Sequence, residues 1–508
     1  MLQGQELIVL SNREPYRHER DESGRLIAMR SASGVVNAVE PLLLSHSGVW
    51  IAEGVGEGDR DAATDRAGLQ VPPDSPRYRL RRVWLTEIEQ HAYYAGFANG
   101  ALWPLCHRTS VQPAFYPAHF QAYEIVNRRF ADAVTEEAST GSPIVLVQDY
   151  HFALVPMMVR WQLPLSRIST FWHIPWPRPE VFALCPWSRA LLDGLLGSSS
   201  IGFQTAADRN AFLAAVEHLL HAEVDHDANT IAYQDRHIAV GVFPASIEWP
   251  GHWACDSLPV GTCREAIRQD LGLAPGAFLG VGVDRLDYTK GIEQKFLAIE
   301  WLLERRPDLV ERFAFVQLAE PSRESLPIYR HTRARILETA VRINQRFSPS
   351  KDGPIRLLEG HHTPDTIARY FRAADFCYVG SLHDGMNLVS KEFVCARDDE
   401  RGVLILSEFA GAAQELTDAL VINPNDFDMA ADAMMIALTM SPQEQRRRMR
   451  AMRAVVAEAD AAHWAERVLA DLAHDPESAP PEGAAALSKP LPPVLSSRPL
   501  AASDVSAS

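Results

Sequence analysis

Features typical of secreted and membrane proteins are absent from this sequence. No apolar run of about 18 residues occurs, so we expect no transmembrane helix. The first apolar stretch, at residues 7–10, is short and no basic residue precedes it, so we expect no signal peptide. The six cysteines are scattered and form no C-x-x-C pair, which is typical of reduced thiols in a cytoplasmic protein.

Positive charge is also scarce. The chain carries 49 Lys and Arg against 65 Asp and Glu, a net charge of −16. Because nucleic acids and anionic membranes attract basic surfaces, this balance argues against both as general partners. It still allows a local basic pocket for phosphate groups.

Signature motifs of several enzyme classes are missing. The sequence has no Walker A or G-x-S-x-G motif, and the glycines at residues 54–58 lack the strand–turn–helix spacing of a dinucleotide site. Three D-x-D matches, at residues 59–61, 225–227 and 426–428, are expected by chance among 65 acidic residues. Because they supply no converging set of hard oxygen ligands, we predict no metal site.

What the sequence does contain is a long alternation of strand-like and helix-like segments. With 508 residues, 47% of them hydrophobic, the chain can form more than one domain. This alternation predicts an α/β protein with two doubly wound halves that face each other across a cleft. The apolar runs that carry the prediction are at residues 7–10, 144–147, 168–172 and 238–243, then 278–283, 313–317 and 403–406.

The stretch at residues 384–392 is the most informative one. It follows an apolar run at residues 375–380 and opens a helix-like segment, so we place it at the carboxyl edge of a parallel sheet, where ligands collect. Asp384 and Glu392 can hold sugar hydroxyls, and the unpaired N–H groups at the helix start can face an anion. The stretch therefore predicts a site for a sugar nucleotide.

A second loop suited to phosphate, at residues 284–291, follows the apolar run at 278–283. Arg285 offers a fork of donors and Lys290 a mobile point charge, an arrangement that suits a diphosphate leaving group. The alternative is a surface loop with internal ion pairs. A second phosphate-suited turn elsewhere in the chain favours the first interpretation.

The N-terminal half offers polar groups after three of its strands. Arg13 follows the first strand, and the small residues at 31–36 could cradle a phosphate with their backbone amides or form a plain turn. Asp149 and His173 follow two later strands, and His173 precedes a stiff proline-rich segment. The alternatives are a solvated arginine, a helix cap and a core histidine.

Aromatic residues at positions 94 and 103 could line a sugar pocket or belong to the core. Together with the phosphate loops, these segments resemble the trehalose-6-phosphate synthase family, which are retaining glycosyltransferases of the GT-B fold. The resemblance runs from about residue 7 to residue 472. Its carriers are residues 11–13, 102–104, 149–151, 173–175, 202–205, 285–291, 384–389 and 407–412.

The resemblance implies four parts of the chain. These are an N-terminal Rossmann-like acceptor-binding domain at residues 1–243 and a C-terminal Rossmann-like nucleotide-sugar-binding domain at residues 244–458. A helix at residues 459–474 would pack back on the N-terminal domain. The tail at residues 475–508, rich in Pro, Ala and Ser, is predicted to be disordered.

The resemblance also implies an activity and a set of site residues. Glucose would pass from a nucleotide diphosphate glucose, with UDP-glucose favoured, to glucose 6-phosphate, and α,α-trehalose 6-phosphate would form with retained configuration. The product implies trehalose biosynthesis and osmoprotection. Catalytic residues would be His173, Arg285, Lys290 and Asp384; donor-binding residues Gly34, Met386, Asn387, Leu388 and Glu392; acceptor-binding residues Arg13, Tyr94, Trp103, Asp149 and Arg323.

No side chain acts as a nucleophile in the family, and the leaving phosphate oxygen assists the incoming hydroxyl, so catalysis would be positioning and charge stabilisation. No cofactor and no metal are implied beyond the nucleotide sugar as co-substrate. Expected partners are small-molecule substrates, with no nucleic acid and no membrane. The nucleobase of the donor stays open, and so does the oligomeric state, with a homo-oligomer as one alternative.

Three departures from the family pattern bear on the acceptor. Ser33 stands where a second glycine is usual, and His383 replaces the frequent Arg before Asp384. The run at residues 13–16 also looks like glucosylglycerol-phosphate synthases, a sister group that uses ADP-glucose and glycerol 3-phosphate. That activity is one alternative, and a non-catalytic sugar-phosphate sensor of the same fold is another.

Overall fold

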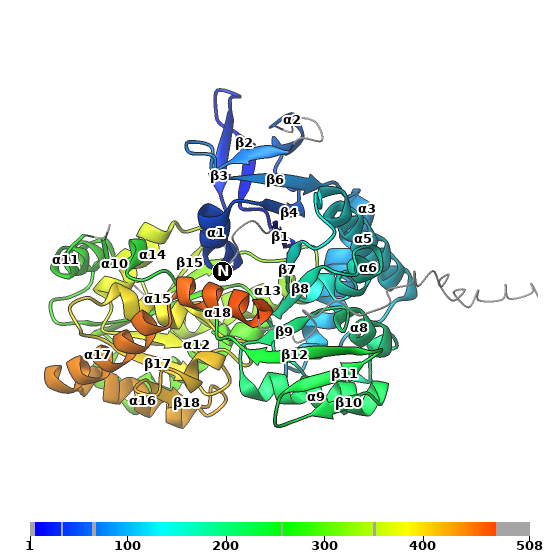
Figure 1. Ribbon diagram of the computed structural model, residues 1–508. Helices are drawn as coiled ribbons and strands as arrows, with labels where there is room; N and C mark the ends of the chain where they lie inside the picture. Colours follow the sequence, from blue (N-terminus) through cyan, green and yellow to red (C-terminus); the bar gives the residue numbers. More distant parts are fainter. Residues whose placement is uncertain (1–5, 32–33, 63–67, 256–257, 349–351, 474–508) are drawn as a thin grey trace, which may run out of the picture. The chain divides into compact units, whose positions relative to one another are not determined.

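The computed structural model describes residues 6–31, 34–62, 68–255, 258–348 and 352–473, which are built on two large β-sheets (Figure 1). Two predictions lie outside these residues: the role of Ser33 in the phosphate loop and the tail from residue 475. Among the described residues, no helix is both long and apolar enough to cross a membrane.

The first sheet has ten strands in the order β10-β11-β12-β9-β8-β7-β1-β4-β6-β5. Its strands from β12 to β6 are parallel, and antiparallel strands close both edges. The strands are β1 (Leu7–Leu10), β4 (Val49–Glu53), β5 (Leu69–Val71), β6 (Tyr78–Val83), β7 (Ile144–Gln148), β8 (Arg167–Trp172), β9 (Ser200–Phe203), β10 (Glu223–Asp225), β11 (Thr230–Tyr233) and β12 (Arg236–Val242).

Helices cover both faces of this sheet, which explains why its central strands read as continuous apolar runs. In β1, Ile8 and Leu10 pack in one core cluster while Leu7 and Val9 pack in another, as the alternation of side chains along a strand requires. The helices are α1 (Gly34–His46), α2 (Asp59–Ala62), α3 (Glu87–Gln90), the π-helix η1 (His91–Leu102), α4 (Trp103–Cys106), α5 (Pro117–Glu137), η2 (Tyr150–Phe152), α6 (Val155–Gln162), α7 (Pro179–Phe182), α8 (Ser188–Leu195) and α9 (Ala206–Leu220).

The second sheet has six parallel strands in the order β15-β14-β13-β16-β17-β18. In sequence order this is 3-2-1-4-5-6, the strand order of dinucleotide-binding folds. The strands are β13 (Phe278–Arg285), β14 (Phe313–Glu320), β15 (Ile355–Glu359), β16 (Phe376–Val379), β17 (Val403–Ser407) and β18 (Leu420–Ile422).

The elements around the second sheet include short 3-10 turns as well as helices. They are α10 (Gly251–Cys255), α11 (Val260–Asp270), η3 (Tyr288–Lys290), α12 (Ile292–Arg305), η4 (Pro307–Leu309), α13 (Pro327–Phe347), α14 (Pro364–Ala373), α15 (Leu388–Ala396), η5 (Gly411–Gln414), α16 (Phe427–Thr439), α17 (Pro442–Glu458) and α18 (Ala461–Ala473). The predicted α/β class with two doubly wound sheets is confirmed.

The last helix, α18, lies against the first sheet. The indole Nε1 of Trp464 donates to the carbonyl of Phe243 at 3.0 Å, and its ring meets that of Phe171 edge to face at 5.2 Å. Helix α18 therefore returns to the N-terminal part of the chain after the second sheet is complete. The exact domain boundaries stay a prediction.

A hairpin between β1 and α1 was not predicted. It comprises β2 (Tyr16–Arg20) and β3 (Leu26–Arg30) and forms a separate two-stranded sheet. The buried Arg82 guanidinium anchors it, because it binds Glu14 at 2.6 Å and Asp59 at 2.8 Å while the backbone N–H of His18 donates to Asp59 at 2.7 Å. These contacts join residues far apart in sequence, so no local pattern reveals them.

Candidate active site

Both sheets place their polar loops at a topological switch point. In the first sheet, β1 lies between β7 and β4, and Arg13 and Asp149 follow the carboxyl ends of β1 and β7. In the second sheet, β13 lies between β14 and β16, so the loop after Arg285 and the turn at Asp384 are neighbours. Crevices at such points are where open α/β sheets bind ligands.

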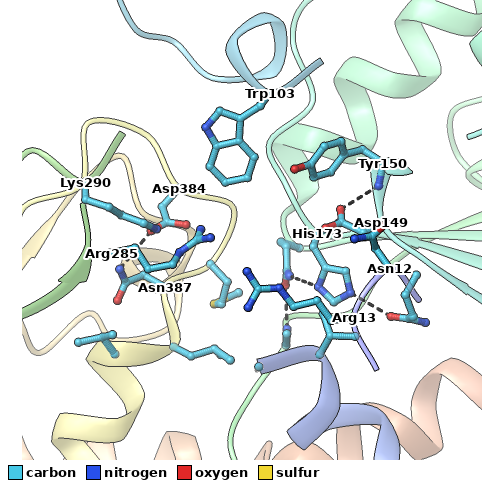
Figure 2. Close-up of a pocket in the computed structure, with 18 of the residues that line it drawn as sticks. Asn12, Arg13, Trp103, Asp149, Tyr150, His173, Arg285, Lys290, Asp384 and Asn387 are labelled. Carbon is cyan, nitrogen blue, oxygen red and sulfur yellow. Dashed lines mark hydrogen bonds and ion pairs between the residues drawn. The ribbon is translucent and has the colours of Figure 1, made fainter. Parts of the chain in front are cut away.

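One cavity of about 390 Å³ brings these loops together. All fourteen predicted site residues line it, in a set drawn from both sheets. Figure 2 shows Arg285, Lys290, Asp384 and Asn387 on one side and Asn12, Arg13, Asp149, Tyr150 and His173 on the other, with Trp103 above them.

The turn before α15 holds its carboxylate in a dense set of contacts. Asp384 accepts from Lys290 Nζ at 2.6 Å and from Asn387 Nδ2 and Ser381 Oγ at 3.1 Å each. Burial raises the pKa of Asp384, but the Lys290 charge and these hydrogen bonds outweigh it, so the pKa lies below its ordinary value. Asp384 is therefore ionised at neutral pH, and Lys290 is paired with it in this structure.

Glycines allow this turn to pack tightly. A Cβ on Gly385 would lie 2.2 Å from the carbonyl oxygen of His173, so only glycine permits the turn to touch the first half there. Asn387 caps α15 by accepting from the Ser390 N–H at 3.1 Å. Met386, Leu388 and Glu392 belong to the same turn and helix and also line the cavity. Burial there raises the pKa of Glu392 to about 7.

Arg285 differs from Lys290 in having no anionic partner. Among the described residues its guanidinium forms no ion pair or hydrogen bond, and it lies over the ring of Trp103 at 5.8 Å. Arg13, on the other side of the cavity, likewise pairs with no described side chain. Two unpaired guanidinium groups in one cavity indicate a ligand with more than one anionic group.

Asp149 and His173 form a fixed polar corner. Asp149 accepts from the backbone N–H of Tyr150 at 3.0 Å and of His173 at 3.2 Å, and burial raises its pKa to about 7. His173 Nε2 lies 2.9 Å from Gln148 Oε1, and because a carbonyl oxygen only accepts, Nε2 carries the proton. Burial lowers the pKa of His173 to about 3, so its imidazole is neutral. Asp149 therefore caps η2, and both Asp149 and His173 line the cavity.

Arg323 adds positive charge to the cavity, and the pKa of Tyr94 reflects that charge. Arg323 bonds Asp287 at 3.2 Å and Tyr329 Oη at 2.6 Å, while its centre lies 4.0 Å from the Trp103 ring. Burial raises the pKa of Tyr94, but the charges of Arg323 and Arg13 outweigh it and lower that pKa to about 8. A phenol whose pKa falls inside a buried site reports a local excess of positive charge.

Three of the non-glycine residues with positive φ lie at this cavity: Asp149 at 77°, Arg323 at 49° and Asn387 at 83°. Such backbone conformations cost free energy and persist only where the surrounding structure fixes them. Their concentration here indicates that the surrounding structure holds these cavity residues in backbone conformations that they do not favour on their own.

Sequence reasoning missed several lining residues. His151 stacks on Tyr94, with ring centroids 5.7 Å apart and planes 8° from parallel, and neither of its buried ring nitrogens has a partner in the part of the chain that the structure describes. Its place directly after Tyr150 at a strand end was a usable signal. Asp284 also lines the cavity, but the buried ion pair that holds it, with Lys295 on α12 at 2.5 Å, leaves no trace in a local pattern.

Among the described residues, no group of three or more His, Cys, Asp or Glu side chains is placed to hold a metal ion. In the discounted D-x-D matches, Asp59 binds Arg82 and Asp428 binds Arg305. The expectation of chemistry without a metal or cofactor stays a prediction.

Comparison with known proteins gives matches along nearly the whole chain. A family model described as glycosyltransferase family 20 matches residues 5–474. A trehalose-6-phosphate synthase of Mycolicibacterium vanbaalenii is 38% identical and covers 92% of this chain and 96% of its own.

Solved structures match as well. An E. coli structure bound with UDP-2-fluoro glucose has a TM-score of 0.81 and 31% identity, covering 92% of this chain and 99% of that one. A UDP-forming α,α-trehalose-phosphate synthase from Burkholderia xenovorans in complex with glucose-6-phosphate has a TM-score of 0.80 and 30% identity, covering 92% and 100%.

Proposed function

This chain belongs to glycosyltransferase family 20, and on that premise we propose that it transfers glucose from UDP-glucose to glucose 6-phosphate, forming α,α-trehalose 6-phosphate with retained configuration. It is an enzyme of the GT-B fold, as the likeness to trehalose-6-phosphate synthase structures shows. The observation that carries the proposal is that one cavity gathers every predicted site residue from both sheets.

The second sheet supplies the donor site. The unpaired Arg285 guanidinium forks onto the diphosphate, and the first N–H groups of α15, together with Gly34 at the start of α1, face its oxygens. Lys290 is held by Asp384 at 2.6 Å, so it is in place to share its charge when the diphosphate arrives. Asp384 then accepts from hydroxyls of the donor glucose, and Glu392 from those of the ribose.

The first sheet supplies the acceptor site together with Arg323, which follows β14 of the second sheet. Arg13, Arg323 and Tyr94 hold the phosphate, and the orphaned nitrogens of His151 beside Tyr94 add a hydrogen bond to it. Trp103 has an indole N–H without a partner and Asp149 an available carboxyl, so both can bond hydroxyls of the acceptor sugar. A sugar phosphate therefore uses groups that glycerol 3-phosphate would leave unpaired.

The bond changes need no protein nucleophile. The bond from the glucose C1 to the β-phosphate oxygen breaks, the bond from C1 to the acceptor's hydroxyl oxygen forms, and the hydroxyl proton passes to the leaving phosphate oxygen. Arg285 and Lys290 stabilise the charge on the diphosphate, and His173, whose N–H is donated to Gln148 and whose pKa is about 3, contacts the donor sugar and is a poor base. We propose no metal and no cofactor for this step.

The same proposal covers the protein's setting. Its partners are the two small-molecule substrates. We propose a cytoplasmic enzyme, which accords with buried cysteines at positions 106, 185, 263 and 377 that form no disulfide among the described residues. A homo-oligomer is compatible with this setting and is tested by sizing the purified protein.

The acceptor decides between the two sister activities. The purified protein is incubated with UDP-glucose or ADP-glucose and offered glucose 6-phosphate or glycerol 3-phosphate, and the phosphorylated product is identified by NMR. The proposal expects trehalose 6-phosphate from UDP-glucose and glucose 6-phosphate. Product from glycerol 3-phosphate alone would overturn it, and binding of both substrates without turnover would indicate a sensor.

A further inference from the structure

A hydrogen bond joins the donor turn to the first half of the chain beside the cavity. The backbone N–H of Arg108, just after α4, donates to Nδ1 of His383 at 3.0 Å, across 275 positions of sequence. Because a backbone N–H can only donate, Nδ1 must be unprotonated. His383 therefore acts as an acceptor in its neutral form, with the proton on Nε2.

His107 continues this contact inward. Its ring meets that of His383 edge to face at 5.9 Å and lies 4.2 Å from the ring of Trp103, with planes 30° apart. Its Nδ1 donates to the Trp103 carbonyl at 2.8 Å, which fixes the ring over the indole. His107 is buried. A continuous path of ring contacts thus runs from the donor turn to an aromatic side chain of the acceptor site.

Trp103 is held by these contacts and still has a free donor. Arg323 from the second half lies 4.0 Å from its ring, and the buried indole N–H has no partner among the described residues. The direction of that N–H depends on how the ring is set. Small shifts of the segment from Trp103 to Arg108 will therefore change the geometry of the hydrogen bond from this N–H to the acceptor's hydroxyl.

Several charged groups face the two histidines, His383 and His107. His383 faces His107 and Arg108 from the segment after α4 and Asp384 from its own turn, and burial lowers its pKa to about 3. His107 faces Asp287, Asp384 and Lys290, and burial lowers its pKa to about 4. A proton on His383 would remove the acceptor for the Arg108 N–H and add a cation beside the Arg108 side chain.

We propose that His383 is a positioning residue, which as a neutral hydrogen-bond acceptor ties the donor turn to the Trp103–Arg108 segment and so sets Trp103 for the acceptor. The inference rests on the proposed function for its kinetic consequence. An arginine, the frequent residue at this position in the family, has no acceptor atom and could not make this contact. The contact is therefore a property of chains with histidine here.

Two substitutions separate the hydrogen bond from ring packing. His383→Asn keeps an acceptor oxygen close to the place of Nδ1 and cannot be protonated, whereas His383→Phe keeps a ring and removes the acceptor. At pH 7.5 we expect His383→Phe to raise KM for glucose 6-phosphate about 10-fold with kcat and donor KM changed less than 3-fold. His383→Asn should stay within about 3-fold of wild type, and exposed His331→Ala serves as the control.

The dependence of stability on pH gives a second signature of the neutral contact. When the contact is broken, His383 has the ordinary histidine pKa of about 6.5, so restoring the contact costs more as pH falls below that value. In the intact contact the pKa of His383 is about 3, so between pH 7.5 and 5.5 kcat/KM of wild type for glucose 6-phosphate should follow that of His383→Asn within about 3-fold. Thermal unfolding over the same range should show wild type losing stability relative to His383→Asn.

The outcomes are separable. A kcat/KM of wild type that falls about 10-fold more than that of His383→Asn between pH 7.5 and 5.5, or an acceptor KM of His383→Phe equal to that of wild type, would overturn the inference. If wild type formed no trehalose 6-phosphate at pH 7.5, the proposed function would fail instead. The unfolding comparison would then still decide the inference, because it needs no turnover: a constant stability difference across pH would contradict it.

Discussion

Asp149 combines a strained backbone, a buried carboxyl and a proposed role in binding the acceptor. Its φ of 77° lies in the left-handed region, and its carboxyl is held by two backbone N–H groups. Its pKa is raised from 3.8 to about 7, because burial penalises the charged form more than those hydrogen bonds favour it. A raised carboxyl pKa contributes stability that is fully present below 3.8 and is lost as pH rises through 7.

Asp149→Asn should therefore trade activity for stability. The free energy of unfolding of the variant, relative to wild type, should increase as pH rises from about 4 to 7 and then level off, with roughly 4 kcal/mol as the upper limit for a shift of this size. Denaturant unfolding at several pH values measures this. Acceptor KM should rise, because the amide is a weaker acceptor for a sugar hydroxyl. A stability difference independent of pH would contradict the account.

His151 gives a second test at the residue scale. Its two buried nitrogens have no partner among the described residues, and burial, together with the charges of Arg323 and Arg13, holds its pKa well below the ordinary value. His151→Phe keeps the stacking on Tyr94 and removes both nitrogens. We expect acceptor KM to rise about 10-fold while donor KM is unchanged, since a hydrogen bond to a charged group is lost. Initial rates with each substrate varied in turn would show it, and an unchanged acceptor KM would exclude His151 from the phosphate site.

At the scale of elements, the loop after β13 depends on one glycine. Gly291 ends η3 and begins α12 with φ of 62°, and a Cβ there would lie 2.1 Å from the carbonyl oxygen of Gly380, which precedes the donor turn. The loop that carries Arg285 and Lys290 and the turn that carries Asp384 are therefore in direct backbone contact. Gly272 has the same φ of 62° but open space around its Cβ position, so it is a matched control.

Gly291→Ala and Gly272→Ala should both pay the left-handed strain of about 1–2 kcal/mol. Only Gly291→Ala should also displace the donor loop against the turn, and so raise the KM for UDP-glucose about 10-fold or more. Thermal unfolding with donor-varied kinetics separates the two effects. Equal donor KM values in the two variants would show that this close contact does not position the donor loop.

The elements at the site differ in how well the sequence predicts them. The strands before Arg13, Asp149, His173, Arg285 and Asp384 are buried on both faces, so they read as short apolar runs and their carboxyl ends could be placed. The π-helix η1 that carries Tyr94 could not be read from a period of 3.6 residues, because a π-helix bonds at i→i+5, and within it the Asn99 side chain donates to the Tyr94 carbonyl at 2.8 Å. Arg323 entered through family resemblance alone, and Tyr94 was an aromatic candidate that only the resemblance assigned to the acceptor.

At the scale of the whole molecule, the sequence pattern predicts the architecture but not the contacts between distant parts of the chain. Alternating strands and helices gave two doubly wound sheets, and the carboxyl-edge rule gave the lining of the cavity. Contacts such as Arg82 with Glu14 and Asp59, Lys295 with Asp284, and Arg108 with His383 join distant residues and have no local signature. The two departures at the residue-13 run and at His383 lie at such contacts, where family pattern is the weakest guide.

The account centres on a cavity in which positioned cations carry the chemistry. The most direct test is the rate of trehalose 6-phosphate formation from UDP-glucose and glucose 6-phosphate by wild type and Arg285→Ala. The control is Arg312→Ala, which removes an exposed arginine that lies over the Phe278 ring, away from the cavity. Because Arg285 has no partner among the described residues, its loss should leave thermal unfolding unchanged while the rate falls about 100-fold or more. An Arg285→Ala protein that forms product at the wild-type rate would contradict the account.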